Sequence, residues 1–436
     1  MQIFNLYKND LLSLSQEPYF ERGILPTEAF AFISYCKALN VDMVIESGTA
    51  YGQSCYLYAK YLNIPVHTID DISHYGDNAQ NTAKERCKNL DVTFHIGDSN
   101  YLLPQLLQQY KDKKIAVFID GPKGQAAQNL RSKIWTVNNN VVIAALHDSV
   151  GDNAIGRFSS ANHPNFLNEY RELFDVDSLN QPYPDNPSIT LIERFETGMG
   201  MDLWYKPRNI IYYVYTGGVD FLYKDFIESA KRHCNPTFMC LTNEDVDVVA
   251  DYRTTFTDEE QGSTMGPKIN ALRRLPLVNG DNVFIMDIDT YCNDDIFKVF
   301  NTVQEIGVTS RNKRDSEVAI YSPINAGVWC FKHSPDMELL FDWFYEQLTN
   351  PSYDKWIEYK RNHPHSQAIG LREWWVDQDL LNILYANQKE FNIEVKDIGA
   401  EYNWIVTDDE FAASKDKNYK ILHRKGGTGK RWNKTY

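Results

Sequence analysis

Short apolar runs that end in acidic or polar residues recur along the chain, with stretches of helical spacing between them. In the first half, such runs lie at 41–46, 65–69, 93–96, 115–119 and 141–146. Each has the length of a buried strand. Strands that alternate with helices favour a parallel sheet, and such sheets bind ligands at the carboxyl ends of their strands. The pattern therefore predicts a doubly wound α/β domain whose crevice collects the polar strand ends.

The alternation resumes in the second half with a strand at 208–215, a helix over 219–232 and a second strand at 237–241. A later apolar run ends in two carboxylates, Asp287 and Asp289. Burying a bare carboxylate is costly, so this strand has to carry both acids to an open edge. There they could bind a hard cation, or simply mark a strand end that precedes a capped helix. A second α/β domain with a parallel sheet is predicted.

The two patterns divide the chain of 436 residues, which is too long for one ordinary domain, into a domain at 1–195, a linker at 196–207 and a domain at 208–436. The first domain is expected to close with a hairpin that pairs 173–176 with 188–192. The segment after this hairpin carries glycine and methionine, and for that reason it is assigned as the linker.

Composition and charge restrict the class of protein. With 43% hydrophobic and 24% charged residues, the chain has the composition of a soluble globular protein. Its net charge of −15 argues against nonspecific binding of nucleic acid, which needs a basic face. The seven cysteines lack a C-x-x-C spacing and are expected to be reduced thiols of a cytoplasmic protein. The first residues lack the apolar core of a signal peptide, and no apolar run approaches the roughly 20 residues of a membrane span.

The loop after the first predicted strand contains two glycines. It reads Glu46-x-Gly48-x-x-x-Gly52-x-Ser54, with Thr49 between the glycines. Glycine permits a tight turn and a close approach of a ligand to the backbone. The spacing is not the G-x-G-x-x-G of dinucleotide-binding proteins, so NAD and FAD are disfavoured.

Later strands of this half also end in residues that can bind ligands or transfer protons. The next strand ends in Asp70, about 20 residues after the loop, where a carboxylate can accept hydrogen bonds from ribose hydroxyls. Strand-end carboxylates could also be helix N-caps, and a histidine beside one could be structural. The other strand-end candidates are Asp98, Ser99, Asp120, His147 and Asp148.

Over residues 25–195 these motifs resemble the small-molecule O-methyltransferase group of the class I S-adenosylmethionine-dependent methyltransferases. The resemblance implies a Rossmann-like methyltransferase fold, S-adenosyl-L-methionine as cofactor and methylation of an oxygen. It places the loop residues around the methionine part of the cofactor, Asp70 at the ribose, and Asp98 and Ser99 at the adenine. The residues implied to bind the cofactor are Glu46, Gly48, Thr49, Gly52, Ser54, Asp70, Asp98 and Ser99.

The same resemblance puts the candidates for catalysis at the reacting end, where some relatives bind a divalent cation. These candidates are Asp120, His147 and Asp148. The family usually has a histidine soon after the Asp-Gly pair, whereas this chain has Pro122-Lys123-Gly124. The catalytic base and any metal of this domain therefore stay open.

Five motifs follow one another in the second half: Gly266-Pro267-Lys268, Asp287-Ile288-Asp289, Asn325-Ala326-Gly327, Asp377-Gln378-Asp379 and a terminal His423 followed by Lys430. In this order they resemble the GT-A glycosyltransferases, most closely the glycogenin-like family eight, over residues 208–436. The resemblance implies a GT-A α/β fold that binds a nucleotide-diphosphate sugar as donor substrate. The chain departs from the family at Lys430, which comes one residue later, and at Arg431, which replaces a proline.

This second resemblance also implies roles. Asp287, Asp289 and His423 would hold Mn²⁺ or Mg²⁺ against the diphosphate. The residues implied to act beside the transferred sugar are Asp377, Gln378 and Asp379. The residues implied to contact the donor are Lys268, Asn325, Gly327 and Lys430.

Together the two resemblances predict a bifunctional glycan-modifying enzyme with a nucleotide sugar and a glycan acceptor as partners. One half would transfer a sugar in a metal-dependent reaction, and the other would methylate the glycan or its precursor. In an alternative, the first half is a non-catalytic docking or dimerisation module. In a third, it is a hydroxylase-like or other metal enzyme on the same fold. The motifs specify neither the sugar, the acceptor, the stereochemical outcome nor the oligomeric state.

Overall fold

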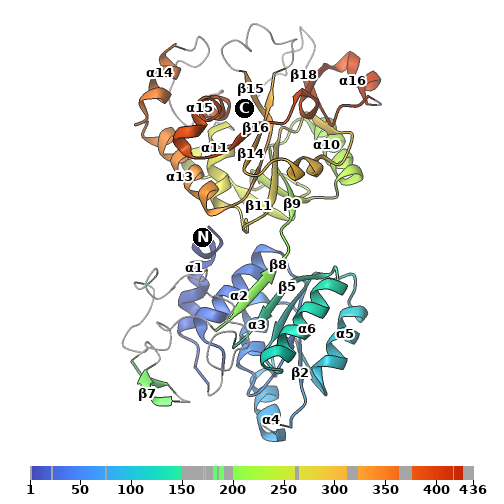
Figure 1. Cartoon of the computed structure of the whole chain (residues 1–436), viewed down its shortest axis with the longest axis vertical. Helices are drawn as coiled ribbons and strands as arrows, with labels where there is room; N and C mark the ends of the chain where they lie inside the picture. Colours follow the sequence, from blue (N-terminus) through green and yellow to red (C-terminus); the bar gives the residue numbers. More distant parts are fainter. Residues whose placement is uncertain are drawn as a thin grey trace. The chain divides into compact units, whose positions relative to one another are not determined.

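The computed structural model divides the chain into two compact units, Ile3–Lys206 and Pro207–Tyr436, the second also including Met1–Gln2. Each unit is built from helices and a central sheet (Figure 1). The predicted α/β class of both units is confirmed. The structure describes residues 2–20, 23–73, 76–148, 170, 172, 180–183, 186–190, 200–260, 265–311, 323–362, 376–415 and 417–425.

The sheet of the first unit has six strands in the order β3-β2-β1-β4-β5-β8. The first five are parallel, and β8 runs antiparallel to β5. Continuous apolar runs form the central strands because both faces of a parallel sheet are covered. The strands are β1 (Met43–Ser47), β2 (Val66–Asp70), β3 (Val92–Ile96), β4 (Ile115–Ile119), β5 (Val141–Leu146) and β8 (Asp202–Tyr205).

Helices cover both faces of this sheet. On one face, apolar residues of α5 and α6 form a core with Ile45 and Val117. On the other, the ring of Phe118 lies 5.5 Å from Phe32 of α2 and 5.4 Å from Tyr58 of α3. Neighbouring residues of β4 thus point to opposite faces, as the pleat requires. The helices are α1 (Gln2–Ser15), α2 (Pro26–Ala38), α3 (Gln53–Leu62), α4 (Gly76–Arg86), α5 (Ser99–Gln109) and α6 (Gly124–Val137).

The predicted linker is wrong in part, because β8 lies within it and completes the first sheet. Asp202 of β8 pairs with the buried Arg131 of α6 at 2.8 Å, and the Arg131 guanidinium lies 3.8 Å from the centre of the Trp204 ring. Residues 188–190 of the predicted late hairpin lie in a strand. Strand β7 (Asn186–Thr190) pairs with β6 (Pro182–Tyr183), and the predicted partner at 173–176 lies outside the described residues.

The sheet of the second unit has seven strands in the order β11-β10-β9-β12-β15-β14-β16. The prediction of a parallel sheet is confirmed for β11, β10, β9 and β12, but it fails at β15, which runs antiparallel to both of its neighbours. This direction brings the start of β15 to the carboxyl end of β12. The strands are β9 (Asn209–Tyr215), β10 (Thr237–Thr242), β11 (Tyr252–Thr255), β12 (Asn282–Met286), β14 (Ile306–Ser310), β15 (Ile324–Lys332) and β16 (Val395–Asp397).

A small three-stranded sheet of the second unit follows the acidic strand end. It consists of β13 (Thr290–Cys292), β18 (Ile421–Lys425) and β17 (Trp404–Thr407). Thr290 lies opposite His423 in its register, so residues far apart in sequence meet beside Asp289. The helices of this unit are α10 (Asp220–His233), α11 (Met265–Asn270), α13 (Pro335–Thr349), α14 (Asp354–Asn362), α15 (Val376–Phe391) and α16 (Asp408–Ser414), with short 3-10 turns η3 (Asp258–Glu260), η4 (Ala271–Arg274), η5 (Ile296–Asn301) and η7 (Ala400–Tyr402).

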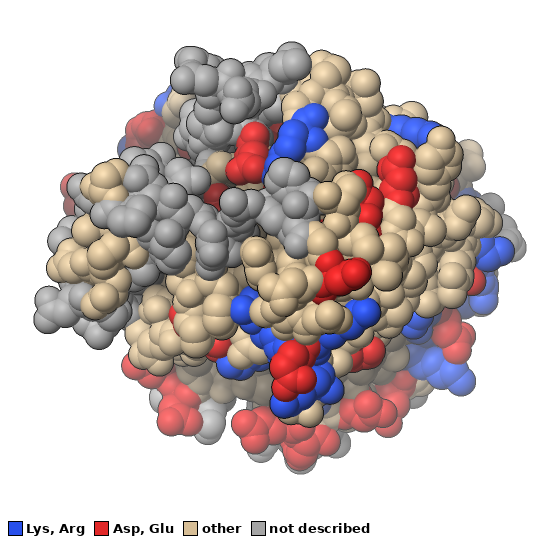
Figure 2. Space-filling view, turned by 90° about the horizontal axis from the view of Figure 1, so that it is seen from below, with Lys and Arg blue, Asp and Glu red and all other residues tan. Residues whose placement is uncertain are grey.

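Two further expectations concern the whole chain. All seven cysteines are free thiols. Among the described residues, no helix is both long enough and apolar enough to cross a membrane. On the face shown in Figure 2, basic and acidic side chains lie next to one another.

Candidate functional site

A cavity of about 510 Å³ lies at the carboxyl ends of β1 to β4 in the first unit. This is the crevice that a doubly wound sheet forms. Of the residues predicted to bind a cofactor, four are not among its described lining residues: Glu46, Thr49, Gly52 and Ser54. The predicted residues that do line it are Gly48, Asp70, Asp98, Ser99 and Asp120.

The two loop glycines make room for different neighbouring segments. Gly48 has a φ of 100°, and a Cβ at this position would lie 2.5 Å from the backbone nitrogen of Gly121. The missing side chain therefore lets the ends of β1 and β4 approach each other beside the cavity. Gly52 has a φ of 77°, and a Cβ there would lie 2.7 Å from Cβ of Ala83 in α4. Gly52 thus permits the packing of α3 against α4.

The carboxylate of Asp70 fastens the glycine loop. Its Oδ2 accepts hydrogen bonds from the backbone N–H groups of Thr49 (2.9 Å) and Ala50 (3.0 Å). Its Oδ1 accepts from the N–H of Ile72 (2.8 Å). Asp70 therefore holds the glycine loop through backbone hydrogen bonds and also borders the cavity.

Glu46 lies behind the loop and is fully buried. Its carboxyl group accepts hydrogen bonds from the hydroxyls of Ser54 and Thr68, the latter at 2.6 Å. Burial is the largest influence and raises the pKa of Glu46 to about 8, although both hydroxyls oppose the shift. The Glu46 side chain therefore connects β1, β2 and α3, and its neutral form is favoured at neutral pH.

The buried Glu46 predicts a pH-dependent stability of the first unit. An exposed glutamate ionises near pH 4.5, so above this pH the unfolded chain releases a proton that the folded chain keeps until about pH 8. The folded state therefore loses stability as the pH rises from 5 to 8, by up to about 4 kcal/mol. Glu46→Gln should remove this loss. Urea unfolding of both proteins at pH 5 and pH 8 measures it, with exposed Glu85→Gln as control. Equal pH dependence in all three proteins would contradict the prediction.

Asp98 and Ser99 begin α5. Oδ1 of Asp98 accepts a hydrogen bond from the N–H of Asn100 (2.7 Å), which makes Asp98 the N-cap of the helix. Ser99 accepts a hydrogen bond from the Ser47 hydroxyl at 2.7 Å. The alternative N-cap role of Asp98 is thus present, and both residues also border the cavity.

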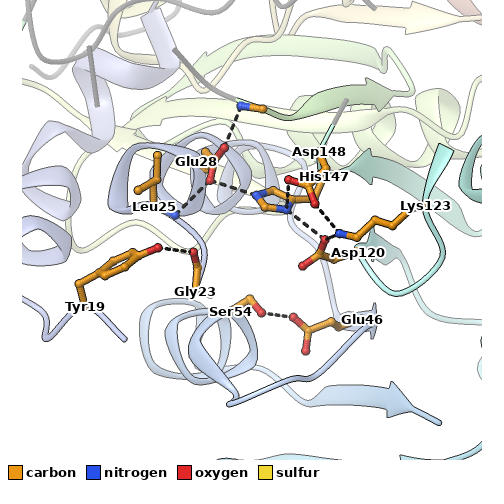
Figure 3. A network of polar contacts seen from close by, with 11 residues as sticks. Tyr19, Gly23, Leu25, Glu28, Glu46, Ser54, Asp120, Lys123, His147 and Asp148 are labelled. Carbon is orange, nitrogen blue, oxygen red and sulfur yellow. Dashed lines mark hydrogen bonds and ion pairs between the residues drawn. The ribbon is translucent and has the colours of Figure 1, made fainter. Parts of the chain in front are cut away.

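The candidates for catalysis form one chain of charges at the ends of β4 and β5 (Figure 3). His147 lies between two carboxylates, with Nδ1 3.0 Å from Oδ1 of Asp120 and Nε2 3.1 Å from Oε2 of Glu28. Lys123 pairs with Asp120 and with Asp148. Negative and positive groups therefore alternate from Glu28 to Asp148.

The charged groups in this chain of charges stabilise one another. Burial lowers the pKa of His147, but Asp120 and Glu28 outweigh it and raise this pKa well above the usual value. Burial alone would raise the pKa of Asp120, yet His147 and Lys123 hold it well below its usual range. The imidazolium form of His147, which donates from both ring nitrogens, is therefore favoured. An imidazolium held between two carboxylates fits the structural role that the sequence leaves open for His147.

In the second unit, the acidic strand end and the terminal histidine converge. Nε2 of His423 lies 3.0 Å from Oδ1 of Asp289 and 3.9 Å from Oδ2 of Asp287. One ligand atom from each of the three residues lies within 4.8 Å of the others. Nε2 is buried and makes no hydrogen bond within the described part of the chain. Nδ1 faces Oδ1 of Asn403 at 2.7 Å, which orients the ring.

Gly327 makes room for this convergence. A Cβ at Gly327 would lie 2.3 Å from Cε1 of His423 and 2.9 Å from Oδ2 of Asp287. The carbonyl of Gly327 accepts a hydrogen bond from the N–H of Asp287 (2.9 Å), and its own N–H donates to Oδ1 of Asn325 (2.9 Å). Asn325 therefore shapes the backbone at the site through its side-chain oxygen.

Lys268 neutralises two acids of this site. Its ammonium lies 2.7 Å from Oδ1 of Asp287 and 3.6 Å from Oδ2 of Asp377. Burial lowers the pKa of Lys268, but the two carboxylates outweigh this and raise it. Burial raises the pKa of Asp377 to about 6, against the opposing charge of Lys268. Gln378 and Asp379 are buried on the same first turn of α15. Lys430 lies outside the described residues.

Three residues of these sites were missed as site residues by the sequence analysis. Glu28 follows Pro26 in the first turn of α2 and accepts from the N–H of Leu25 (3.0 Å), a helix-start pattern visible in sequence. Its contact with His147 spans 119 residues and has no sequence signal. Lys123 stood out only as a departure from a family pattern. Asn403 is fixed by the Thr309 hydroxyl, to which its amide donates at 2.9 Å.

Comparisons with known proteins give fold similarity. No protein-family model matches the chain, and no curated protein matches it. The apo structure of mouse xyloside xylosyltransferase 1 matches at 10% identity and a TM-score of 0.32, over 50% of this chain and 97% of that one. The apo structure of a TDP-rhamnose 3'-O-methyltransferase of calicheamicin biosynthesis matches at 15% identity and a TM-score of 0.26, over 36% and 80%.

An O-methyltransferase from Bacillus cereus, solved in complex with SAH, matches at 17% identity and a TM-score of 0.25, over 39% of this chain and 77% of that one. At these values the likeness concerns the fold alone. The chain has folds that resemble those of O-methyltransferases and of a glycosyltransferase.

Proposed function

We propose that the second unit transfers a sugar from a nucleotide-diphosphate donor in a metal-dependent reaction. The observation that carries the proposal is the convergence of Asp287, Asp289 and His423 around space that Gly327 leaves free. Two carboxylates and an imidazole suit Mn²⁺, and Mg²⁺ would accept the same oxygen ligands. The buried Nε2 of His423 has its hydrogen-bonding capacity unused within the described residues, which fits a metal ligand.

Each residue of this site has a distinct part in the proposal. The cation, when bound, neutralises charge on the diphosphate leaving group. Lys268 holds Asp287 and Asp377 at fixed positions and limits the repulsion between them. Asp377, Gln378 and Asp379 present polar groups at the start of α15 to the transferred sugar. Lys430 adds a second positive charge to the phosphates, as the family resemblance implies.

The first unit, in the same proposal, methylates an oxygen of the glycan or its precursor with S-adenosylmethionine. The cavity at β1 to β4 has the size of a small-molecule site, about 300–1,000 Å³. Gly48 brings the backbone close to the ligand, and Asp70, Asp98 and Ser99 supply polar groups along it. Asp148, half exposed and with a left-handed φ of 53°, is the carboxylate at the open end of the charge chain.

A calorimetric titration of the whole chain tests the glycosyltransferase proposal. Nucleotide sugars should bind in the presence of Mn²⁺ and bind on the order of 100-fold more weakly in chelator, because the metal connects donor and protein. Asp289→Asn should cause the same loss with Mn²⁺ present. Asp336→Asn, which removes an exposed acid on α13, should not. Donor binding that is equal in chelator and in Mn²⁺ would contradict the site.

The alternative of a docking module remains for the first unit. Titration of S-adenosylmethionine into the same protein distinguishes a methyltransferase from a docking module. Failure to bind the cofactor or its product at millimolar concentration would favour the docking module and would leave the second unit's assignment intact.

A further inference from the structure

The ammonium group of Lys123 lies at the point in the first unit where a divalent cation would have to bind. It pairs with both Asp120 and Asp148. Together with His147, these two carboxylates are the group of described residues in this unit that could ligate a metal. We propose that Lys123 is the built-in cation of this site, so that the first unit takes no divalent metal ion. This inference rests on the proposed methyltransferase function.

His147 does not fit a metal ligand. A metal needs a lone pair on the ring nitrogen, but Nδ1 faces Asp120 at 3.0 Å and Nε2 faces Glu28 at 3.1 Å. Two carboxylates around a buried ring favour the imidazolium, which has no lone pair to give. The first unit thus differs from the second, where Nε2 of His423 points at two carboxylates and makes no hydrogen bond within the described residues.

The charges of the two carboxylates that could still bind a metal ion are already neutralised. Asp120 lies between the positive charges of His147 and Lys123, and Asp148 pairs with Lys123. A divalent ion would have to displace the ammonium and would then face the imidazolium. Because like charges at contact distance repel strongly in a partly buried site, the ion gains little there.

Lys123 can act on the acceptor oxygen in place of a metal ion. An ammonium has three donors, and among the described residues its contacts with Asp120 and Asp148 use two of them. Lys123 also lines the cavity, so its third N–H can donate to the acceptor oxygen. That oxygen attacks the methyl carbon of the sulfonium, and the carbon–sulfur bond breaks with its electron pair going to sulfur. The hydroxyl proton passes to Asp148.

Binding of Mn²⁺ to the full chain tests the inference, with the paramagnetic resonance signal of the free ion as readout. All proteins carry Asp289→Ala, which removes a ligand of the second unit's site. With Lys123 present, no Mn²⁺ should bind at submillimolar concentration. With Lys123→Ala, one ion should bind at least about tenfold more tightly than it binds to the protein that keeps Lys123, because the two carboxylates are left without their cation. Lys133→Ala removes an exposed charge from α6 and should create no site.

Two outcomes would overturn the inference. One is a Mn²⁺ site in the protein that keeps Lys123, provided that Asp148→Asn abolishes it. The other is the absence of any new site in a folded Lys123→Ala protein, with folding checked by thermal unfolding. S-adenosylmethionine titrated into the same samples tests the methyltransferase function separately, so loss of that function would not be mistaken for either outcome.

Discussion

Replacing Gly327 with alanine should abolish Mn²⁺-dependent binding of nucleotide sugars, with a loss on the order of 100-fold. The new methyl group would lie 2.3 Å from Cε1 of His423 and 2.9 Å from Oδ2 of Asp287. The ring cannot easily move away, because Asn403 holds Nδ1 at 2.7 Å and Thr309 holds Asn403 at 2.9 Å. The substitution therefore pushes two proposed ligands out of position.

Calorimetric titration of the donor with Mn²⁺ measures this loss. Gly218→Ala is the control, since Gly218 has a φ of 86° but no atom within 4 Å of the added Cβ. It introduces backbone strain in the same unit without a clash. A folded Gly327→Ala protein that binds donor and Mn²⁺ like the native chain would show that these residues do not form the metal site.

Gly48→Ala should lower the affinity for S-adenosylmethionine by about 100-fold or more while nucleotide-sugar binding is unchanged. The added Cβ would lie 2.5 Å from the Gly121 nitrogen, and the φ of 100° is unfavourable for alanine. The N–H groups of Asp120 and Gly121 both donate to the carbonyl of Ser47, at 2.7 and 2.6 Å. Separating these strand ends would therefore move Asp120 and open the cavity wall.

Gly76→Ala is the matched control, because Gly76 has a φ of 71° and open space around its Cβ position. Cofactor binding is followed by calorimetry and folding by thermal unfolding. If Gly48→Ala weakened the binding of both ligands equally, the two units would depend on each other for folding. Unchanged cofactor affinity in a folded protein would remove the glycine loop from the proposed cofactor site.

The positions of the strand ends could be predicted because apolar runs and their acidic ends are local in sequence. The end of β12 is an example: its buried apolar strand is followed directly by Asp287 and Asp289. Once a sheet of alternating strands and helices is assumed, residues at carboxyl ends have to lie together. This reasoning brought Asp120, His147 and Asp148 to one edge, and the structure has them there.

Contacts between distant segments could not be predicted in this way. Glu28 reaches His147 only because α2 packs beside the end of β5, and nothing at Glu28 indicates that partner. Strand β8 has only four residues and follows directly on a segment that carries glycine and methionine, so the sequence favoured a linker. Its identity as a strand depends on pairing with β5, whose register aligns Ala144 with Trp204.

The position of β8 also matters for any attempt to separate the two units. A chain cut within the predicted linker, before Asp202, would lose the edge strand of the first sheet. The backbone N–H and C=O groups of β5 would then be unpaired along an open edge, which is a template for self-association. Arg131 would at the same time lose the Asp202 carboxylate and the Trp204 ring that cover its charge. Aggregation of such a fragment would result from the missing strand and would give no information about function. A soluble first unit therefore has to extend through Tyr205.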